Sequence, residues 1–405
     1  MHILYIHQHF TTNAGASGTR SYDYARYLVQ AGHQVTVISG VYALGPFVDK
    51  AGGLIQTRII DGIKVVIINV PYANQMSFYA RVMSFLLFAM LSVVVCFRES
   101  RVDVVLATST PLTVGIPALL MRWLRRVPYV FEVRDIWPDV AVALGVLRNP
   151  VLIRLAYFAE RLFYRWAARV QVISGGMKKI LIDRGIPAEK ITVVPTGVDL
   201  TLYENVKPDH SLRKKLGWTD RLIAVYAGAI SDANGLEYVI EAAARLKDDP
   251  RVGFLLIGDG RRKPDLMEQA QRRKLSNLVF HDKMPKRKLI SILADMDVGM
   301  LILKDLPDFR IAMPNKFFDY LAAGLAVIVN FQGDAATQLN QVGAGIATDP
   351  DDPETFASAI KRWAESPEEL TRTKLAAKRL AKRYDRKEWA KELDKILMEV
   401  ALQRQ

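Results

Sequence analysis

Residues 221–260, RLIAVYAGAISDANGLEYVIEAAARLKDDPRVGFLLIGDG, contain the pattern that decides the fold. Apolar runs at 222–228 and 252–257 predict two buried strands, and the segment between them predicts a helix. Near-continuous Val, Ile and Leu runs separated by helices are typical of parallel sheets that are covered on both faces. The stretch therefore predicts one strand–helix–strand unit of a doubly wound α/β sheet.

The same alternation continues through almost the whole chain of 405 residues, a length that suits two domains. Candidate strands lie at 2–6, 33–39, 63–70, 102–108, 128–134, 170–174, 191–195, 222–228, 252–257, 278–281, 298–303, 326–331 and 345–348. A polar stretch at 201–220 lacks strand periodicity and separates two sets of strands. We therefore expect an α/β architecture of two doubly wound, Rossmann-like parallel-sheet domains that face each other across a cleft, with ligands at the carboxyl ends of the strands.

We place the two domains at 1–200 and 201–375. The remaining segment, 376–405, is charged and has apolar positions every three or four residues, which predicts a C-terminal helix. We expect this helix to pack back on the first domain.

The formal net charge is +13, and residues 1–200 carry most of it, with 21 Lys and Arg against 12 Asp and Glu. A basic half prefers an anionic neighbour such as a membrane surface, a phosphorylated acceptor or nucleic acid, although excess charge can also serve solubility alone. Nucleic acid is the weakest of the three, because the sequence has no zinc-finger spacing and no RNA-recognition run. The single cysteine, Cys96, and an N-terminus without the features of a secretory signal predict a cytoplasmic protein.

Two segments of the first domain could meet a membrane surface. Residues 82–97 form a run of 16 uncharged residues, whereas a spanning helix needs about 20, so we favour a buried or interfacial helix. In 151–170, arginines recur at helical spacing beside aromatic residues, namely at Arg154, Arg161, Arg165 and Arg169. This stripe indicates either an anionic membrane face or a solvated helix face. We expect a peripheral position at the inner face of the plasma membrane.

The stretch MPNKFFDYLAAG, 313–324, predicts a helix that begins at Pro314 and Asn315. Two of its residues fit that helix poorly. Lys316 lies in the first turn, where the helix dipole disfavours a cation, and Asp319 lies three residues later on the same face. Diphosphate oxygens at the first backbone N–H groups would explain the cation, and ribose hydroxyls would explain the carboxylate. A nucleotide diphosphate therefore accounts for both residues.

Other loops that follow predicted strands give weaker signals. Gly15 and Gly18 lie between a strand and a helix, but they match neither a Walker loop nor the dinucleotide fingerprint, so a plain turn is the alternative. Arg134 and Asp135 end a strand, where a charged pair is either functional or a structural ion pair.

Metal coordination is poorly supported. Asp295 and Asp297 have a D-x-D spacing that could hold a divalent cation. They precede a predicted strand at its amino end, which is the wrong side for a ligand, so we interpret them as structural. The histidines form no cluster with metal-ligand spacing.

Several segments, taken in order, resemble the family 4 glycosyltransferases with the GT-B fold over essentially the whole chain. They are GASGTRSYDYARYLVQAGHQVTVISG (15–40), FEVRDIWPD (131–139), VISGGMKKILIDRGIPAEKITVVPTGVD (172–199), YAGAISDANGLEYVIEAAARL (226–246), LLIGDGRRKPDL (255–266) and PNKFFDYLAAGLAVI (314–328). The resemblance implies transfer of a hexose from a nucleotide sugar, UDP-glucose or a related UDP-sugar, with retention of configuration and without a metal or other cofactor. The similar subgroup assembles bacterial exopolysaccharides and envelope polysaccharides, often on lipid-linked acceptors.

The resemblance also implies roles for the two domains and for single residues. It makes 1–200 the acceptor-binding domain and 201–375 the nucleotide-sugar-binding domain. Asp319 matches the second carboxylate of the family's E-x7-E motif, the ribose ligand, whereas Ile311 stands at the first. The family's Arg and Lys on the diphosphate are missing near Ala229 and Asn234, so Lys316 with Arg310 would replace them.

We carry these roles over as a set of expected site residues. Arg134, at the position of a family histidine near the reacting sugar, Asp135 and Lys316 are the expected catalytic residues. The expected donor-binding residues are Gly15, Gly18, Arg20, Gly228, Asn234, Gly258, Arg310, Pro314, Asn315, Lys316 and Asp319.

Three other functions fit part of the pattern. A nucleotide-sugar epimerase would have a similar architecture, but it would not need the basic, apolar-rich first half. A nicotinamide-dependent oxidoreductase is disfavoured by the missing G-x-G-x-x-G. An inactive nucleotide-sugar-binding subunit stays possible because the first carboxylate and the Arg/Lys pair are absent.

Overall fold

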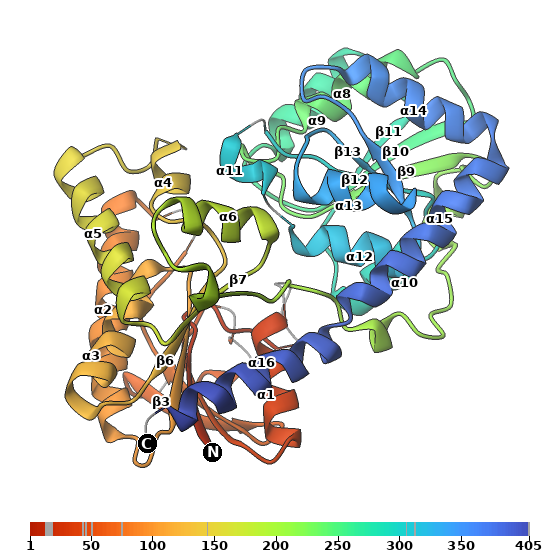
Figure 1. The fold of residues 1–405 in the computed structure, drawn as a ribbon. Coiled ribbons are helices and arrows are strands. Elements are labelled where there is room, and N and C mark those ends of the chain that lie inside the picture. Colours follow the sequence, from red (N-terminus) through yellow and green to blue (C-terminus); the bar gives the residue numbers. More distant parts are fainter. Residues whose placement is uncertain are drawn as a thin grey trace. The chain divides into compact units, whose positions relative to one another are not determined.

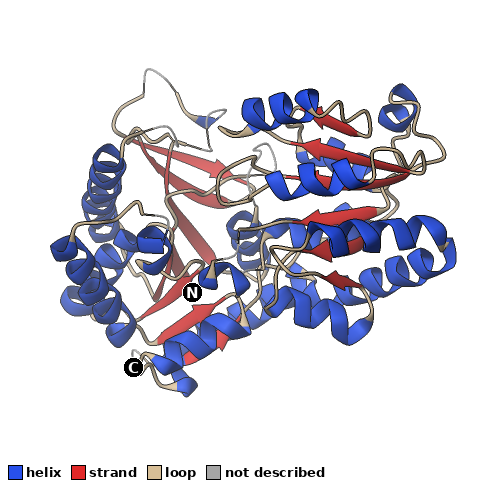
Figure 2. Cartoon of the chain, turned by 90° about the horizontal axis from the view of Figure 1, so that it is seen from above, coloured by secondary structure: helices blue, strands red, loops and turns tan. Residues whose placement is uncertain are grey.

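The computed structural model describes residues 1–12, 19–42, 44, 47–49, 52–73, 76–143, 145–304, 306–311 and 313–403. It divides into two compact units, Met1–Pro195 with Arg386–Gln405, and Thr196–Asp385. Each has a mainly parallel sheet between layers of helices, as expected (Figures 1 and 2).

The first unit contains an eight-stranded sheet in the order β3-β4-β2-β1-β5-β6-β7-β8. Its strands are β1 His2–Ile6, β2 Gln34–Gly40, β3 Ile55–Ile60, β4 Ile63–Ile68, β5 Val104–Thr108, β6 Tyr129–Val133, β7 Arg169–Val172 and β8 Ile191–Val193. Its helices are α1 Arg20–Gln30, α2 Phe78–Arg98, α3 Gly115–Arg125, α4 Asp139–Ala143, α5 Pro150–Trp166, α6 Gly175–Asp183 and α16 Arg386–Leu402, with short 3-10 turns at Leu112–Val114 and Ala188–Lys190.

The second unit contains a six-stranded sheet in the order β11-β10-β9-β12-β13-β14. Its strands are β9 Leu222–Ala227, β10 Val252–Ile257, β11 Leu278–His281, β12 Val298–Leu301, β13 Ala326–Val329 and β14 Gly345–Ala347. Its helices are α7 Ser211–Lys215, α8 Glu237–Arg245, α9 Lys263–Arg272, α10 Lys286–Leu293, α11 Pro307–Arg310, α12 Asn315–Ala323, α13 Asp334–Val342, α14 Pro353–Glu365 and α15 Pro367–Ala381, with 3-10 turns at Leu200–Leu202 and Lys382–Tyr384.

The opening strand of the sequence pattern shows how the second core forms. Val225 of β9 faces α10, α12 and α15, whereas Ala224 faces α8 and α14. Successive side chains of a strand point to opposite faces, so a strand buried on both faces reads as a continuous apolar run. The continuous apolar run of β9 therefore reflects a parallel strand whose two faces are buried in two different hydrophobic clusters.

One strand was not predicted. β3 pairs with β4 antiparallel, and a turn at Asp61 and Gly62 joins them, both with positive φ (49° and 79°). The other pairings in both sheets are parallel. An Asp-Gly pair is a known hairpin signal, and it accounts for an antiparallel strand directly before β4.

The unit boundaries also differ from the expected ones. The polar stretch 201–220 lies inside the second unit, so the boundary falls after Pro195 and not after residue 200. The C-terminal segment divides at 385, because α15 buries Ala377 and Leu380 in the second core, whereas α16 buries Leu393 and Leu397 in the first. Only 386–405 therefore returns to the first unit.

Two helical layers cover the first sheet (Figure 1). α1 and α16 share a core with one face of the sheet, and α3 packs against α2 and α5 on the other side. α5 ends at Trp166, and Arg169 is the first residue of β7. The predicted arginine stripe therefore holds only Arg154, Arg161 and Arg165 on the helix.

Candidate functional site

The second sheet brings several of the predicted donor residues of the second unit to one edge. Strand order reverses where β9 lies between β10 and β12, and ligands of doubly wound sheets bind at such a switch point, beyond the carboxyl ends of the strands. Gly228 follows β9 and Gly258 follows β10. The two loops touch, because a Cβ on Gly258 would lie 1.9 Å from the Gly228 carbonyl oxygen.

Lys316 lies at this edge, in the first turn of α12. Its Nζ donates to the Tyr226 hydroxyl at 2.7 Å and lies 4.2 Å from the centre of that ring. The Tyr226 hydroxyl in turn donates to the Ala229 carbonyl at 2.7 Å. A Cβ on Gly228 would lie 3.3 Å from Nζ, so the ammonium group sits directly over the loop after β9.

The Lys316 ammonium is a buried cation without a countercharge. Its side chain is partly accessible, but the ammonium group is enclosed, and this desolvation lowers the Lys316 pKa to about 7. Across the described part of the chain, no carboxylate lies within ion-pair distance of it. Because an isolated buried charge is unfavourable, this position favours an anionic ligand.

Asn234 completes the surroundings of Lys316. It is 8% exposed and lies in the loop before α8. With its amide oriented to satisfy its neighbours, Nδ2 donates to the Ala229 carbonyl at 2.7 Å and Oδ1 accepts from Lys316 Nζ at 3.3 Å. The residue at the position of the family's lysine therefore holds Lys316 in place.

Asp319 lies one turn along α12 and is already hydrogen-bonded. Oδ1 accepts from the Tyr203 hydroxyl at 2.8 Å, and Oδ2 accepts from Lys286 Nζ at 2.5 Å. Lys286 is the first residue of α10, which follows β11, so it lies at the same edge of the sheet. Each carboxylate oxygen can accept a second bond, which leaves capacity for ribose hydroxyls.

The start of α12 is formed by Pro314 as the N-cap and Asn315 as the first helical residue. Asn315 Oδ1 is buried and has no hydrogen-bond partner among the described residues. Arg310 ends α11 and has an exposed side chain, and its carbonyl packs so close to Gly333 that a Cβ there would lie 1.7 Å away. The helix therefore begins at Pro314 and Asn315, as the sequence predicts, and the donor-binding role of these residues stays a prediction.

Arg20 has a structural environment in the first unit. Its guanidinium group is fully buried, pairs with Glu132, donates to the Val194 carbonyl at 3.0 Å and lies 4.5 Å from the Tyr24 ring centre. We therefore leave Arg20 out of the donor site. Gly15 and Gly18 lie outside the described residues.

Arg134 and Asp135 follow β6 in the first unit. The backbone N–H of Arg134 donates to Ser109 Oγ at 3.1 Å, and Thr110 Oγ1 donates to Asp135 Oδ2 at 2.7 Å. The two side chains are not an ion pair, since Asp135 is exposed and bonded to Thr110 instead. The structural ion-pair alternative for them is wrong.

The D-x-D pair is structural, as interpreted. Arg213 bridges both carboxylates, with Nε 3.3 Å from Asp295 Oδ2 and Nη2 2.9 Å from Asp297 Oδ2. Asp297 Oδ2 also accepts from the Ile223 backbone N–H at 3.0 Å. Within the described ranges, no group of three or more His, Cys, Asp or Glu is placed to hold a metal ion.

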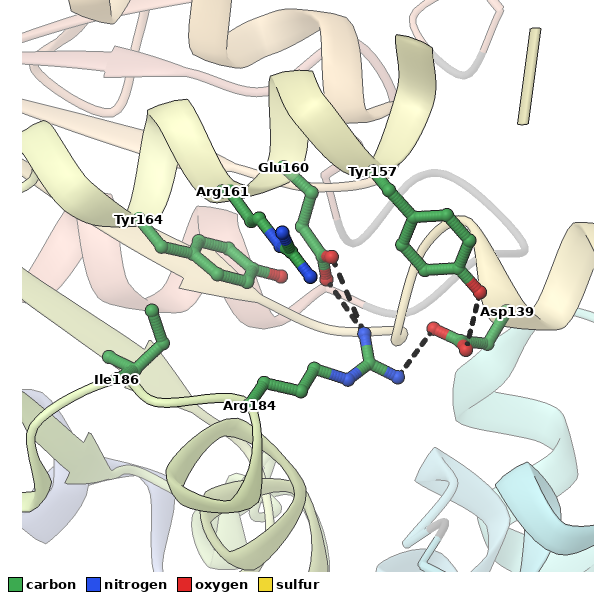
Figure 3. A pocket seen from close by; sticks show the side chains of 7 residues that line it. All are labelled: Asp139, Tyr157, Glu160, Arg161, Tyr164, Arg184 and Ile186. Atoms are coloured by element: carbon green, nitrogen blue, oxygen red, sulfur yellow. Dashed lines mark hydrogen bonds and ion pairs between the residues drawn. The ribbon is translucent and has the colours of Figure 1, made fainter. Parts of the chain in front are cut away.

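A separate pocket of about 250 Å³ lies in the first unit (Figure 3). Arg184 donates to Glu160 Oε1 at 3.2 Å and to Asp139 Oδ2 at 2.8 Å, and the Tyr157 hydroxyl donates to Asp139 Oδ1 at 2.9 Å. Burial raises the Glu160 pKa to about 7. The network joins α4, α5 and the end of α6, and it contains none of the predicted donor or catalytic residues.

Sequence reasoning missed the partners of both key side chains. Tyr226 belongs to an apolar strand, and Lys286 and Tyr203 lie 33 and 116 residues from Asp319. From the sequence, a lysine as the first residue of the helix after β11 only weakly indicates a partner of Asp319. Only the sheet topology brings these side chains together.

Two family models match the chain in succession. Residues 15–197 match the glycosyl transferase 4-like domain, and residues 221–366 match the glycosyl transferases group 1. Together with the two parallel-sheet units, these matches define the class: the chain belongs to the glycosyltransferases with the GT-B fold.

Particular relatives agree with this class. The chain is 28% identical over 244 residues to WcaI of Escherichia coli, a glycosyl transferase assigned to colanic acid biosynthesis, covering 58% of this chain and 59% of that protein. It is 26% identical over 191 residues to an alpha-monoglucosyldiacylglycerol synthase of Streptococcus pneumoniae, covering 45% of this chain and 42% of the synthase. The matched regions therefore span about half the length of these relatives. HepE of Anabaena, solved with UDP, has the same fold, with a TM-score of 0.73, 17% identity and coverage of 98% and 100% of the two chains.

Proposed function

We propose that this glycosyltransferase moves a hexose from UDP-glucose or a related UDP-sugar to a lipid-linked glycan acceptor, with retention of configuration, in polysaccharide assembly. The membership in the glycosyltransferases and the UDP complex of HepE support a UDP-sugar donor. The assignment of WcaI supports a polysaccharide product, and the name of the diacylglycerol synthase supports a lipid acceptor. The retaining course is carried over from the family resemblance.

The observation that carries the proposal is the buried Lys316 ammonium at the switch point of the second sheet. The donor diphosphate binds there, against Lys316 and the N–H groups at the start of α12, and supplies the missing negative charge. The ribose hydroxyls bind Asp319, which Tyr203 and Lys286 hold in position.

The same groups promote the reaction. As the bond between the anomeric carbon and the diphosphate breaks, negative charge grows on the leaving oxygens, and Lys316 with the fixed N–H dipoles stabilises it. The attacking hydroxyl transfers its proton to the departing phosphate on the same face. Since Lys316 supplies the positive charge, we propose that no metal is required. From the family resemblance, we also propose a catalytic role for Arg134 and Asp135.

The donor site is tested by titrating UDP into wild type and Asp319→Asn in the presence of a chelator. A charge-assisted bond to a hydroxyl is worth about 1.5–3 kcal/mol, so the variant is expected to bind UDP roughly tenfold or more weakly. Asp265→Asn, the same change at an exposed residue of the second unit, is the control. Equal affinity in the folded Asp319 variant removes Asp319 from the site, and loss of wild-type binding in chelator refutes the metal-free proposal.

The membrane part of the proposal rests on an exposed apolar surface of the first unit, which we call the α2/α3/α5 surface. Its members are Tyr79, Met83, Leu86, Leu87, Met90, Val94 and Phe97 of α2, Trp123 and Leu124 of α3, and Val151, Leu152, Leu155, Phe158 and Trp166 of α5. The Trp123 and Trp166 rings meet at 5.7 Å and join α3 to α5.

This surface has the character of a membrane-binding face. α2 is long and apolar enough to cross a membrane, and an 18-residue stretch of it has a mean hydropathy of 2.2. Of this stretch, 33% is buried, and the buried Phe88 and Cys96 pack the helix into the first unit. Exposed Arg154, Arg161 and Arg165 accompany the apolar residues of α5. Apolar side chains beside arginines fit the interface of an anionic bilayer. We therefore propose a peripheral position at the inner face of the plasma membrane.

We expect salt-sensitive binding to anionic liposomes. Each basic residue near an anionic bilayer contributes about 1 kcal/mol, so Arg161→Glu with Arg165→Glu should reduce the bound fraction about tenfold or more. The measurement is co-sedimentation at low and high salt. Arg261→Glu with Arg272→Glu, exposed residues of the second unit, is the matched charge control. A wild type that stays in the supernatant at low salt refutes the membrane proposal.

A further inference from the structure

Arg184 joins three helices of the first unit at the pocket shown in Figure 3. It is the C-cap of α6, and Gly185, with φ +85°, ends the helix directly after it, which fixes the backbone at this point. The Arg184 guanidinium lies 2.8 Å from Asp139 Oδ2 of α4 and 3.2 Å from Glu160 Oε1 of α5. One side chain therefore links α4, α5 and α6.

Asp139 ends the segment that carries the two expected catalytic residues, because α4 begins four residues after Asp135. At the start of this segment, the Arg134 backbone N–H and the Asp135 carboxylate are bonded to the loop after β5. Its far end is held at Asp139, by Arg184 at 2.8 Å and by the Tyr157 hydroxyl at 2.9 Å. The far anchor thus helps to set where the segment lies.

Glu160 is the third member of the network and is only 2% exposed. Both of its carboxylate oxygens accept from Arg184 Nη1, at 3.2 and 3.4 Å. Burial, partly offset by the positive charge of Arg184, raises the Glu160 pKa to about 7. The charge of Glu160 therefore changes near neutral pH, and the pocket of about 250 Å³ beside it is large enough to admit water.

The titratable and charged groups that face Glu160 come from three elements. They are Arg184 at the end of α6, Asp139 of α4, and Tyr157, Arg161 and Tyr164 of α5 itself. Helix α3 also packs against α5, but its Arg125 donates to the Glu99 carbonyl at 2.7 Å and its Arg122 lies near Tyr129. Among the described residues, Arg184 is thus the ion-pair partner on which the charge of Glu160 acts.

The two charge states of Glu160 hold Arg184 differently. When Glu160 is ionised, two carboxylates on different helices attract the guanidinium group, which ties α4 to α5. When Glu160 is protonated, its bond to Arg184 loses one of the two charges and weakens, and Asp139 is left as the charged partner. The adjoining pocket leaves space for the Arg184 side chain to move.

We propose that Arg184, Asp139 and Glu160 form a proton-sensitive clasp that positions the segment of Arg134 and Asp135. The clasp is closed when Glu160 is ionised and loosens when it is protonated. This inference rests on the catalytic role proposed for Arg134 and Asp135, and it specifies what holds them in place.

The test uses ¹⁹F NMR of protein labelled with 5-fluorotryptophan, because Trp137 lies between Asp135 and Asp139 and reports on the segment directly. Trp137→Phe identifies its resonance. Between about pH 5.5 and pH 8.5, the wild-type resonance is expected to shift with a midpoint of about 7. In Glu160→Gln it should keep the low-pH position throughout. Glu189→Gln, at an exposed glutamate of the same unit, is the control and should shift as wild type does.

Substitutions of Arg184 test whether the signal passes through the clasp. Arg184→Met should abolish the shift of the Trp137 resonance. Arg184→Lys should restore it at lower amplitude, because an ammonium group keeps the charge but lacks the planar fork of a guanidinium group. A residue that only supported the fold would give no pH-dependent signal to lose or restore.

Hydrogen exchange at about pH 8 is the second measurement. The backbone N–H groups of Val140 and Val142 donate to the Ile136 and Pro138 carbonyls, so their exchange reports on the opening of α4. We expect exchange at least threefold faster in Glu160→Gln than in wild type. Glu160→Gln should fold, since it removes a carboxylate whose ionised form is penalised by burial above pH 7. Circular dichroism checks the fold of each variant.

The clasp is refuted if the wild-type Trp137 resonance does not shift, or if it shifts equally in folded Glu160→Gln or Arg184→Met. Equal exchange in Glu160→Gln and wild type also refutes it. Lys316 has a pKa of about 7 as well, but it lies in the second unit and is unchanged in Glu160→Gln, so this variant separates the two groups. Neither measurement needs a ligand, whereas loss of UDP binding by wild type would refute the donor proposal.

Discussion

Replacing Lys316 with methionine is expected to weaken UDP binding by about tenfold to somewhat more than a hundredfold. The lysine is the enclosed cation at the switch point, and in a desolvated site a charge-assisted bond to phosphate is worth about 1.5–3 kcal/mol. Methionine has a similar length and fills the space over the Tyr226 ring, so the variant tests charge and not packing. Isothermal titration calorimetry with UDP measures the effect.

The variant should be at least as stable as wild type at pH 7. Desolvation lowers the Lys316 pKa to about 7 in the folded protein, below the usual value of about 10.4 in an unfolded chain. The unfolded state therefore binds more protons between these values, so wild-type stability rises with pH in this window and is lowest below it. Methionine removes this penalty, and Tyr226 keeps its bond to the Ala229 carbonyl.

Lys247→Met, at an exposed lysine of the second unit, is the matched control and should bind UDP as wild type does. Unchanged UDP affinity in Lys316→Met would exclude Lys316 from the donor site. A melting temperature far below that of wild type would show that the ammonium group is structural.

Glu132→Gln is expected to destabilise the first unit by about 3–5 kcal/mol, the usual effect of removing one partner of a buried ion pair. Glu132 is fully buried, pairs with Arg20, and accepts from Thr108 Oγ1 and Gln171 Nε2, each at 2.7 Å. Without the carboxylate, the Arg20 charge stays buried with only a neutral amide beside it. For a unit of this size, such a loss lowers the melting temperature by roughly 10 °C or more.

Glu388→Gln is the control, because this exposed glutamate of α16 pairs only at the surface with Lys391. Surface ion pairs contribute about 0–1 kcal/mol, so the melting temperature should hardly change. Thermal unfolding followed by circular dichroism measures both variants. Equal melting temperatures for Glu132→Gln and wild type would show that the buried pair does not support the fold.

Most of the fold was predictable because parallel, doubly covered strands have a strong local pattern. The run at 222–228 and its counterparts all became strands, and the alternation with helices gave the architecture. β3 was not predicted because it is an antiparallel strand at the sheet edge, with Ile59 exposed, and it lacks the continuous apolar run of the buried parallel strands. The boundary after Pro195 was not predicted, because the polarity of a segment such as 201–220 does not show which unit it packs against.

The site was predictable only where a residue breaks a local rule. Lys316 was found because a cation in the first helical turn is unfavourable, and Asp319 because it lies on the same face. Arg20 follows a glycine-bearing loop, as a ligand-binding residue would. Its buried partner Glu132 lies 112 residues away in the sequence, so the structural role of Arg20 could not be predicted.

The central claim, that the donor diphosphate binds the Lys316 ammonium group, is tested most directly by counting protons during UDP binding at pH 8. In the free protein Lys316 is mostly neutral at this pH, since its pKa is about 7, whereas a bound diphosphate would keep it protonated. Calorimetry in two buffers of different ionisation enthalpy should therefore show uptake of nearly one proton by wild type and none by Lys316→Met. The same proton count in both proteins would contradict the claim.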